Sequence, residues 1–311
     1  MNSSTAESAP SADDEAQPMI SLVVCTTGAP DRMQELERRL AASLDAGGAV
    51  IEALVVDNSA GASVRFGDTR IRIVRCASRG LSRARTTGCM HARGDVIVFT
   101  DDDVDFDADW PMELAAPIVE GRVDATAAPV RLGEAYTGVT TLLLREWLAE
   151  ANLSGAPKLV GAGMALHRRT LGFGLWDQNL GAGQPLFAFG EEQLFEYMIR
   201  AAGANVDVVA SAGVVHRPDP ARMTEDGWRR TALQKGYSEA YLSHHWWGNS
   251  LARPRLRLWR RLARLWIHRR LRHPDLESEL RLIESIGLAR GHTVLRRTKP
   301  IYLPRATERI R

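Results

Sequence analysis

The chain has 311 residues, enough for one large α/β domain with an appendage. Its 40 Lys and Arg residues nearly balance its 38 Asp and Glu residues, so net charge points to no class of partner. The three cysteines lack metal-ligand spacing, which argues against a cysteine zinc site and favours a reducing, cytosolic compartment. No apolar stretch is long enough for a membrane-spanning helix. Residues 1–17 have no secretory apolar segment and are expected to form a disordered tail.

Apolar strands alternate with amphipathic helices along the first part of the chain. We expect strands at 19–26, 51–56, 71–74, 95–100, 125–131, 158–167, 206–210 and 213–215. Helices are expected at 32–44 with Asp31 as N-cap, at 81–92, 142–151 and 193–201, and beyond 228. The alternation predicts βαβ units and a mainly parallel sheet.

The run from Val96 to Asp103 joins a buried strand to the consecutive carboxylates Asp101, Asp102 and Asp103. In open α/β sheets, ligands bind just beyond the carboxyl ends of the strands. Carboxylates at that edge suit a hard divalent cation that carries a phosphate-bearing substrate. A solvated acidic turn is the alternative for the run in isolation, and the surrounding motifs favour the cation site. A calcium loop is excluded because its Gly and closing Glu are missing.

Four motifs follow one another between residues 20 and 217. They are Val24–Arg32, Val55–Ser59, the blocks GLSRARTTG, ARGD and DDD between Gly80 and Asp103, and Gly190–Phe195, with His216 downstream. In order and spacing they resemble the family 2 glycosyltransferases. The resemblance implies a GT-A fold, a single Rossmann-like nucleotide-binding domain with a mostly parallel mixed sheet. We assign it to residues 18–245, followed by a basic helical extension at 246–311.

The resemblance also implies an inverting transferase that moves a sugar from a nucleotide-diphosphate donor to an acceptor hydroxyl with Mn²⁺ or Mg²⁺. It makes Asp103 the metal ligand, with His216 either a second ligand or a hydrogen-bonded loop histidine. The implied donor-binding residues are Thr26, Asp57, Arg85, Asp101, Asp102 and Gly163. Structural alternatives are an Asx turn for Asp57, a salt bridge for Arg85 and a strand bulge for Gly163.

Two adjacent carboxylates, Glu191 and Glu192, precede the helix expected at 193–201. One of them would serve as the general base, since an acceptor hydroxyl is a poor nucleophile until a carboxylate takes its proton. Glu192 aligns with the acidic residue of the family motif and is the predicted base, with Glu191 as the alternative. A structural alternative explains one of the two glutamates without a catalytic role, because a carboxylate stabilises the N-terminus of a helix.

The segment 255–272 combines Trp and Leu at helical spacing with many arginines and no acidic residue. Such a helix either binds an anionic membrane surface, near lipid-linked acceptors, or packs on the catalytic domain with its arginines solvated. No motif indicates a nucleic-acid partner. We therefore expect a cytoplasmic enzyme, free or at the inner membrane face, in cell-envelope, glycolipid or secondary-metabolite glycosylation.

Two other functions compete with a glycosyltransferase. A sugar nucleotidyltransferase needs a glycine-rich phosphate loop after the first strand, but the segment from Cys25 to Pro30 contains a single glycine, Gly28. The second competing function is that of a non-catalytic module that retained the nucleotide-binding fold. It predicts that replacing Glu191 and Glu192 leaves function intact.

Overall fold

The computed structural model describes residues 19–248, 259, 263 and 275–302. The tail predicted at 1–17 and most of the basic segment 255–272 lie outside these residues. Within the described part of the chain, no helix is both long and apolar enough to cross a membrane.

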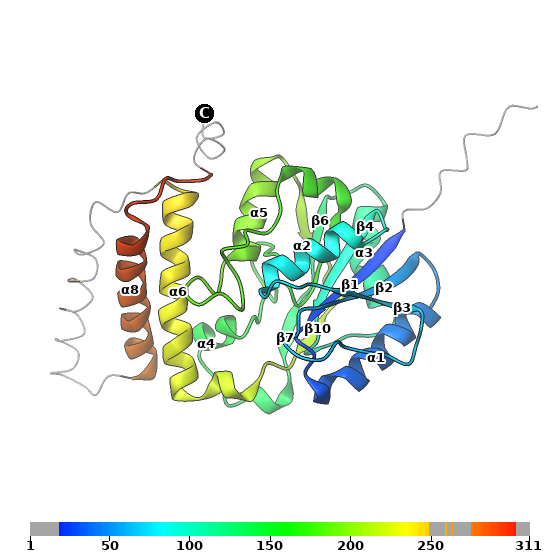
Figure 1. The fold of residues 1–311 in the computed structure, drawn as a ribbon, viewed down its shortest axis with the longest axis horizontal. Helices are drawn as coiled ribbons and strands as arrows, with labels where there is room; N and C mark the ends of the chain where they lie inside the picture. Colours follow the sequence, from blue (N-terminus) through cyan, green and yellow to red (C-terminus); the bar gives the residue numbers. More distant parts are fainter. Residues whose placement is uncertain (1–18, 249–258, 260–262, 264–274, 303–311) are drawn as a thin grey trace, which may run out of the picture.

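A seven-stranded sheet in the order β3-β2-β1-β4-β8-β6-β9 forms the centre of the molecule (Figure 1). Its strands are β1 (Ile20–Thr26), β2 (Val50–Asp57), β3 (Ile71–Arg75), β4 (Val96–Asp101), β6 (Ala125–Ala127), β8 (Met164–His167) and β9 (Val206–Val208). The strands β3, β2, β1 and β4 run parallel, whereas β8 is antiparallel to β4 and β6. The predicted mixed, mostly parallel sheet is therefore confirmed.

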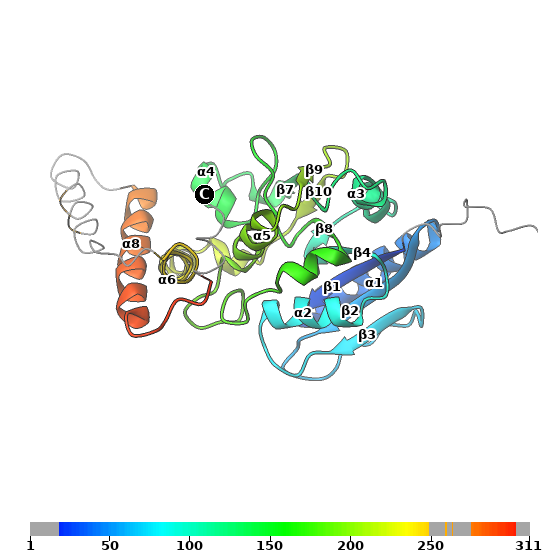
Figure 2. The ribbon, with the colours of Figure 1, turned by 90° about the horizontal axis from the view of Figure 1, so that it is seen from above.

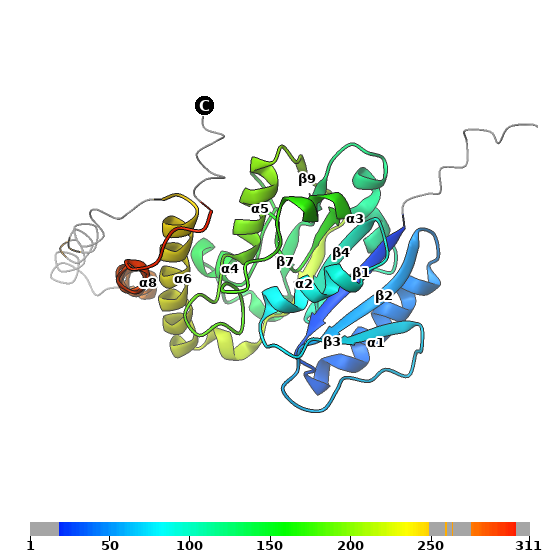
Figure 3. The ribbon, with the colours of Figure 1, turned by 45° about the horizontal axis from the view of Figure 1, so that its top comes forward.

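Helices cover both faces of this sheet (Figure 3). The described helices are α1 (Pro30–Asp45), α2 (Leu81–His91), α3 (Trp110–Val119), α4 (Leu142–Trp147), α5 (Glu191–Ala201), α6 (Glu225–His245) and α8 (Leu276–Leu295), with 3-10 helices η1 (Glu134–Tyr136), η2 (Arg168–Phe173) and η3 (Pro220–Met223). Successive side chains of a strand point to opposite faces. Accordingly, Val23 packs in the core shared with α2 and α5, whereas Val24 packs with α1 and α3.

A second sheet in the order β5-β10-β7 lies at the carboxyl end of β4. It consists of β5 (Val104–Asp105), β10 (Val214–His216) and β7 (Val130–Leu132). The predicted single strand at 125–131 was wrong, because Pro129 lacks an N–H for the ladder and the chain passes there from β6 to β7. Since β10 pairs with β5, His216 lies opposite Val104, directly after the acidic run.

Two other differences from the sequence prediction involve proline. Helix α1 begins at Pro30 with Ala29 as N-cap, so Asp31 lies in the first turn and is not the cap. Proline suits the first helical position because the N–H it lacks would have no partner there. Helix α3 was not predicted, and its Pro111 and Pro117 hide the helical pattern.

Helices α6 and α8 lie side by side at the end of the molecule farthest from β3 (Figure 2). Glycines make their close approach possible. A Cβ on Gly236 would overlap the Glu284 carbonyl oxygen, and one on Gly287 would overlap that of Leu233. Buried side chains that include Trp147, Trp228 and Leu280 join α4, α6 and α8 in a small core of their own.

Gly236→Ala should destabilise the protein although alanine favours helices. The clash with the α8 backbone should cost about 1–3 kcal/mol, which exceeds the helix-propensity gain of up to about 1 kcal/mol. Gly172→Ala is the control, because nothing lies within 4 Å of its added Cβ. Urea denaturation checks this, and a Gly236→Ala midpoint equal to that of wild type would contradict it.

Candidate active site

The predicted donor and metal residues gather where β1, β2 and β4 end. In the parallel register Thr26 lies beside Asp57, and Cys25 lies beside Asp101. The chain then carries Asp102 and Asp103 from the end of β4 into β5. This edge is where ligands bind in sheets of this kind.

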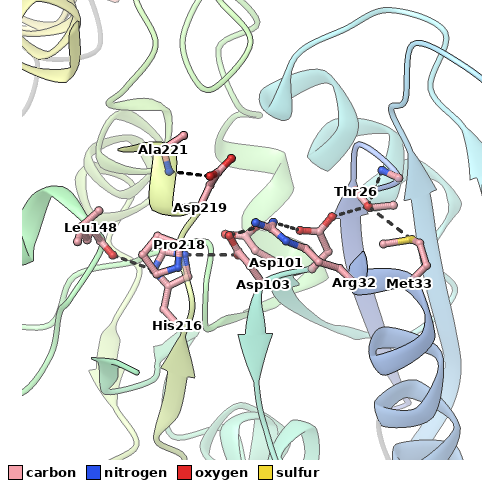
Figure 4. Close-up of polar contacts among 12 residues, drawn as sticks. Thr26, Arg32, Met33, Asp101, Asp103, Leu148, His216, Pro218, Asp219 and Ala221 are labelled. Carbon is pink, nitrogen blue, oxygen red and sulfur yellow. Dashed lines mark hydrogen bonds and ion pairs between the residues drawn. The ribbon is translucent and has the colours of Figure 1, made fainter. Parts of the chain in front are cut away.

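Asp103 and His216 face each other across the two sheets (Figure 4). The His216 Nε2 atom lies 3.4 Å from Asp103 Oδ1, and His216 Nδ1 lies 2.7 Å from the Leu148 carbonyl oxygen, which can accept a hydrogen bond from it. Burial alone would lower the pKa of His216, but the hydrogen bond and charge of Asp103 outweigh burial and raise that pKa. The structure thus brings together both residues that were predicted to hold a metal.

Arg32, in the first turn of α1, contacts two carboxylates of the acidic run, Asp102 and Asp103. Its Nη1 atom lies 2.9 Å from Asp102 Oδ1 and 3.2 Å from Asp103 Oδ2. The Thr26 hydroxyl donates a hydrogen bond to the second oxygen of Asp102, so the Asp102 carboxylate is held by residues of β1 and α1. Arg32 was not predicted as a site residue, although it closes the motif from Val24 to Arg32.

Arg85 on α2 connects the acidic strand end to the start of α5. Its side chain is 1% exposed, and its guanidinium nitrogens lie 3.1 Å from Glu191 Oε1 and 2.9 Å from Glu192 Oε1. Asp101 Oδ1 follows at 3.6 Å. Sequence reasoning placed Arg85 at a diphosphate, but in the structure protein carboxylates surround its guanidinium.

The two glutamates at the start of α5 have different surroundings. The Glu191 side chain is 6% exposed, and burial together with the charge of Glu192 raises its pKa to about 7. The Glu192 side chain is 26% exposed, and its Oε1 atom accepts a hydrogen bond of 2.7 Å from the Gly161 backbone. Of the two, Glu192 is therefore the carboxylate more accessible to a substrate.

Gly161, rather than Gly163, is the glycine at these carboxylates. A Cβ on Gly161 would overlap the Arg85 guanidinium. A Cβ on Gly163 would instead lie 2.7 Å from the Ala128 side chain, within the core. The donor-binding role predicted for Gly163 thus has no support from its neighbours, because the small residue is needed there for packing.

Asp57 is fully buried at the end of β2. Its carboxylate accepts hydrogen bonds from the backbone N–H groups of Ser59 and Val64, at 2.9 and 3.1 Å, and from Arg75 Nη1 at 2.6 Å. The bond to Ser59, two residues on, is the Asx turn that sequence reasoning held as the alternative to nucleobase binding.

Comparison with known proteins finds a family model that matches part of the chain. Residues 21–165 match the model described as Glycosyl transferase family 2. No curated protein sequence matches the chain. Among solved structures, the mannosyltransferase PcManGT from Pyrobaculum calidifontis, in complex with GDP-Man and Mn²⁺, shares 17% identity at a TM-score of 0.52 over 94% of this chain and 79% of its own.

A mycobacterial protein shares 20% identity at a TM-score of 0.50, over 73% of this chain and 74% of its own. At these identities, the two structures show likeness of fold alone. The acidic strand end, the glutamates of α5 and the family match within 21–165 agree with one another. Residues 21–165 therefore carry a glycosyl transferase family 2 domain, and the chain has a GT-A-like fold.

Proposed function

We propose that the protein transfers a sugar from a nucleotide-diphosphate sugar to an acceptor hydroxyl, by a single displacement with inversion at the anomeric carbon. One observation carries this proposal: Arg85 contacts Asp101 at the end of β4 and both glutamates of α5. A candidate metal site and a candidate base thereby lie at one edge of the sheet. The family match over residues 21–165 favours this reaction over the two alternatives, a sugar nucleotidyltransferase and a non-catalytic module.

Asp103 and His216 would hold the divalent cation. Carboxylate and imidazole ligands suit Mn²⁺, and a carboxylate also suits Mg²⁺. Among the described residues, no group of three or more His, Cys, Asp and Glu side chains is arranged to hold a metal. A site with only two protein ligands leaves positions for diphosphate and water oxygens. When bound, the cation offsets the charge that develops on the leaving diphosphate.

Glu192 would act as the general base. It takes the proton of the acceptor hydroxyl as that oxygen attacks the anomeric carbon, while the bond from this carbon to the diphosphate oxygen breaks. Glu192 is preferred to Glu191 because Glu191 is packed against Gly181 and Arg85, where an acceptor has less access. Glu191 would position Arg85, and Arg85 would hold Glu192 in place.

The residues that would bind the donor are Thr26, Asp57, Asp101 and Asp102, which lie at the ends of β1, β2 and β4. Four further points stay predictions from the sequence. They are a lipid-linked acceptor, contact with an anionic membrane, a cytoplasmic location and the glycosylation pathway. The membrane contact depends on the segment 255–272, most of which lies outside the described residues.

Glu192→Gln should lower turnover by about 10²–10⁴-fold, the usual contribution of a general base, while donor binding is retained. Release of nucleoside diphosphate from the donor measures turnover, and calorimetry measures donor binding. Glu191→Gln is the matched comparison on the neighbouring residue. The assignment of the base fails if Glu192→Gln keeps near-normal turnover and Glu191→Gln loses it.

Affinity for Mn²⁺ should fall as the pH is lowered, because a metal binds the neutral imidazole and Asp103 raises the pKa of His216. Below that pKa the affinity for Mn²⁺ should fall by about tenfold per pH unit, because binding displaces one proton. Calorimetric titration of Mn²⁺ from about pH 8 to about pH 6 measures it. His216→Asn should weaken binding and flatten this dependence, so an equally steep profile in His216→Asn would argue against ligation by His216.

A further inference from the structure

Lys235 of α6 has an ammonium group with aromatic neighbours near the candidate base. Its Nζ atom lies 4.7 Å from the centre of the Phe189 ring and 5.9 Å from that of Trp147. Phe189 lies just before Gly190 and Glu191, so one of the two rings beside Lys235 belongs to the segment that positions the base. The rings favour a cation, but they neutralise none of its charge.

Arg222 of η3 contacts the backbone of Trp147. Its Nη2 atom donates a hydrogen bond of 2.9 Å to the Trp147 carbonyl oxygen, while the Trp147 ring faces Lys235. Both cations are half-buried. None of the ion pairs among the described residues includes Lys235 or Arg222. Cations that are partly removed from water normally have such partners.

The contacts of these two cations indicate where each one lies relative to the reaction. Arg222 binds the Trp147 carbonyl oxygen, and His216 Nδ1 lies 2.7 Å from the carbonyl oxygen of the next residue, Leu148, which places Arg222 beside the candidate metal site. Burial lowers the pKa of Arg222, and Asp103 and Asp101 oppose that shift. Burial also lowers the pKa of Lys235, with Glu284, Glu192 and Glu191 opposing and Arg222 adding to the shift. Lys235 lies over the Phe189 ring, two residues before Glu191, and therefore on the side of the base, where an acceptor hydroxyl must come within hydrogen-bond reach.

We propose that Lys235 and Arg222 form a subsite for a negatively charged group of the acceptor, a carboxylate or a phosphate. This rests on the proposed function, because it takes Glu192 as the base. A compact ammonium ion and a planar guanidinium with several N–H donors together suit such an anion. The donor diphosphate is the other possible source of the same chemistry, and the experiment must separate the two.

Lysine NMR gives a direct measurement, because the sequence contains only the lysines Lys158, Lys235 and Lys299. Reductive ¹³C-methylation keeps their charge and gives each a resolvable signal. Lys235→Gln assigns its signal by removing it. The protein is first saturated with diamagnetic Mg²⁺ and with whichever of UDP, GDP and dTDP it binds, and inorganic phosphate is then titrated.

The proposal expects the Lys235 signal to shift with phosphate while the nucleotide stays bound. Lys235→Gln should weaken phosphate binding by about tenfold or more, the loss of one charge-assisted contact. Lys235→Arg should largely retain it, and Lys299→Gln, at an exposed position, should match wild type.

Two results would overturn the subsite. One is a Lys235 signal that moves with the nucleoside diphosphate but not with phosphate, which assigns Lys235 to the donor. The other is a signal that responds to neither ligand although calorimetry shows the nucleotide bound, which leaves Lys235 a structural role. If no nucleotide binds at all, the proposed function itself fails, and that outcome is distinguished before any phosphate is added.

Discussion

The buried guanidinium of Arg85 is the interaction on which the site depends. A charge at 1% exposure is tolerated only when its partners compensate the lost hydration. Glu191, Glu192 and Asp101 supply that compensation from α5 and from the end of β4. Arg85 therefore fixes the distance between the acidic strand end and the candidate base. The absence of a side chain at Gly161 leaves the room that the guanidinium occupies.

The same arrangement gives neighbouring carboxyl groups different proton affinities. Burial raises the pKa of Asp101 to about 6 and, with Glu192, raises that of Glu191 to about 7, while Arg85 opposes both shifts. Burial alone would raise the pKa of Asp103, yet His216 and Arg32 lower it. Asp103 thus remains ionised, as a metal ligand must be. Carboxyl groups whose environments separate their pKa values in this way commonly have separate roles.

Local sequence patterns identified the parts of the site but not all of their contacts. The strand ending at Asp101, the glutamates that begin α5 and the histidine that ends β10 could be predicted, because buried strands and helix starts have short-range signatures. Arg32 could not, since its contact with Asp103 joins residues far apart in the chain through the order of β1 and β4. The partners of Arg85 depend in the same way on how α5 packs against α2.

Proline and glycine account for other differences. Pro129 divides one apolar run between two sheets, and this division creates β7, beside which β10 carries His216 to Asp103. In the segment from Gly161 to Met164, only the fold determines which glycine faces the carboxylates. The sequence shows where a small residue stands, but the neighbour that requires it belongs to another element.

The central claim is that Asp103 holds a divalent cation which binds the donor diphosphate. Thermal unfolding with UDP, GDP or dTDP, each with and without Mn²⁺, tests it in wild type and in Asp103→Asn. A nucleotide at about a hundred times its Kd should stabilise the protein by roughly 2.7 kcal/mol. We predict a metal-dependent shift with one nucleotide that Asp103→Asn abolishes. A shift of equal size in Asp103→Asn, or none with any nucleotide, would contradict this account.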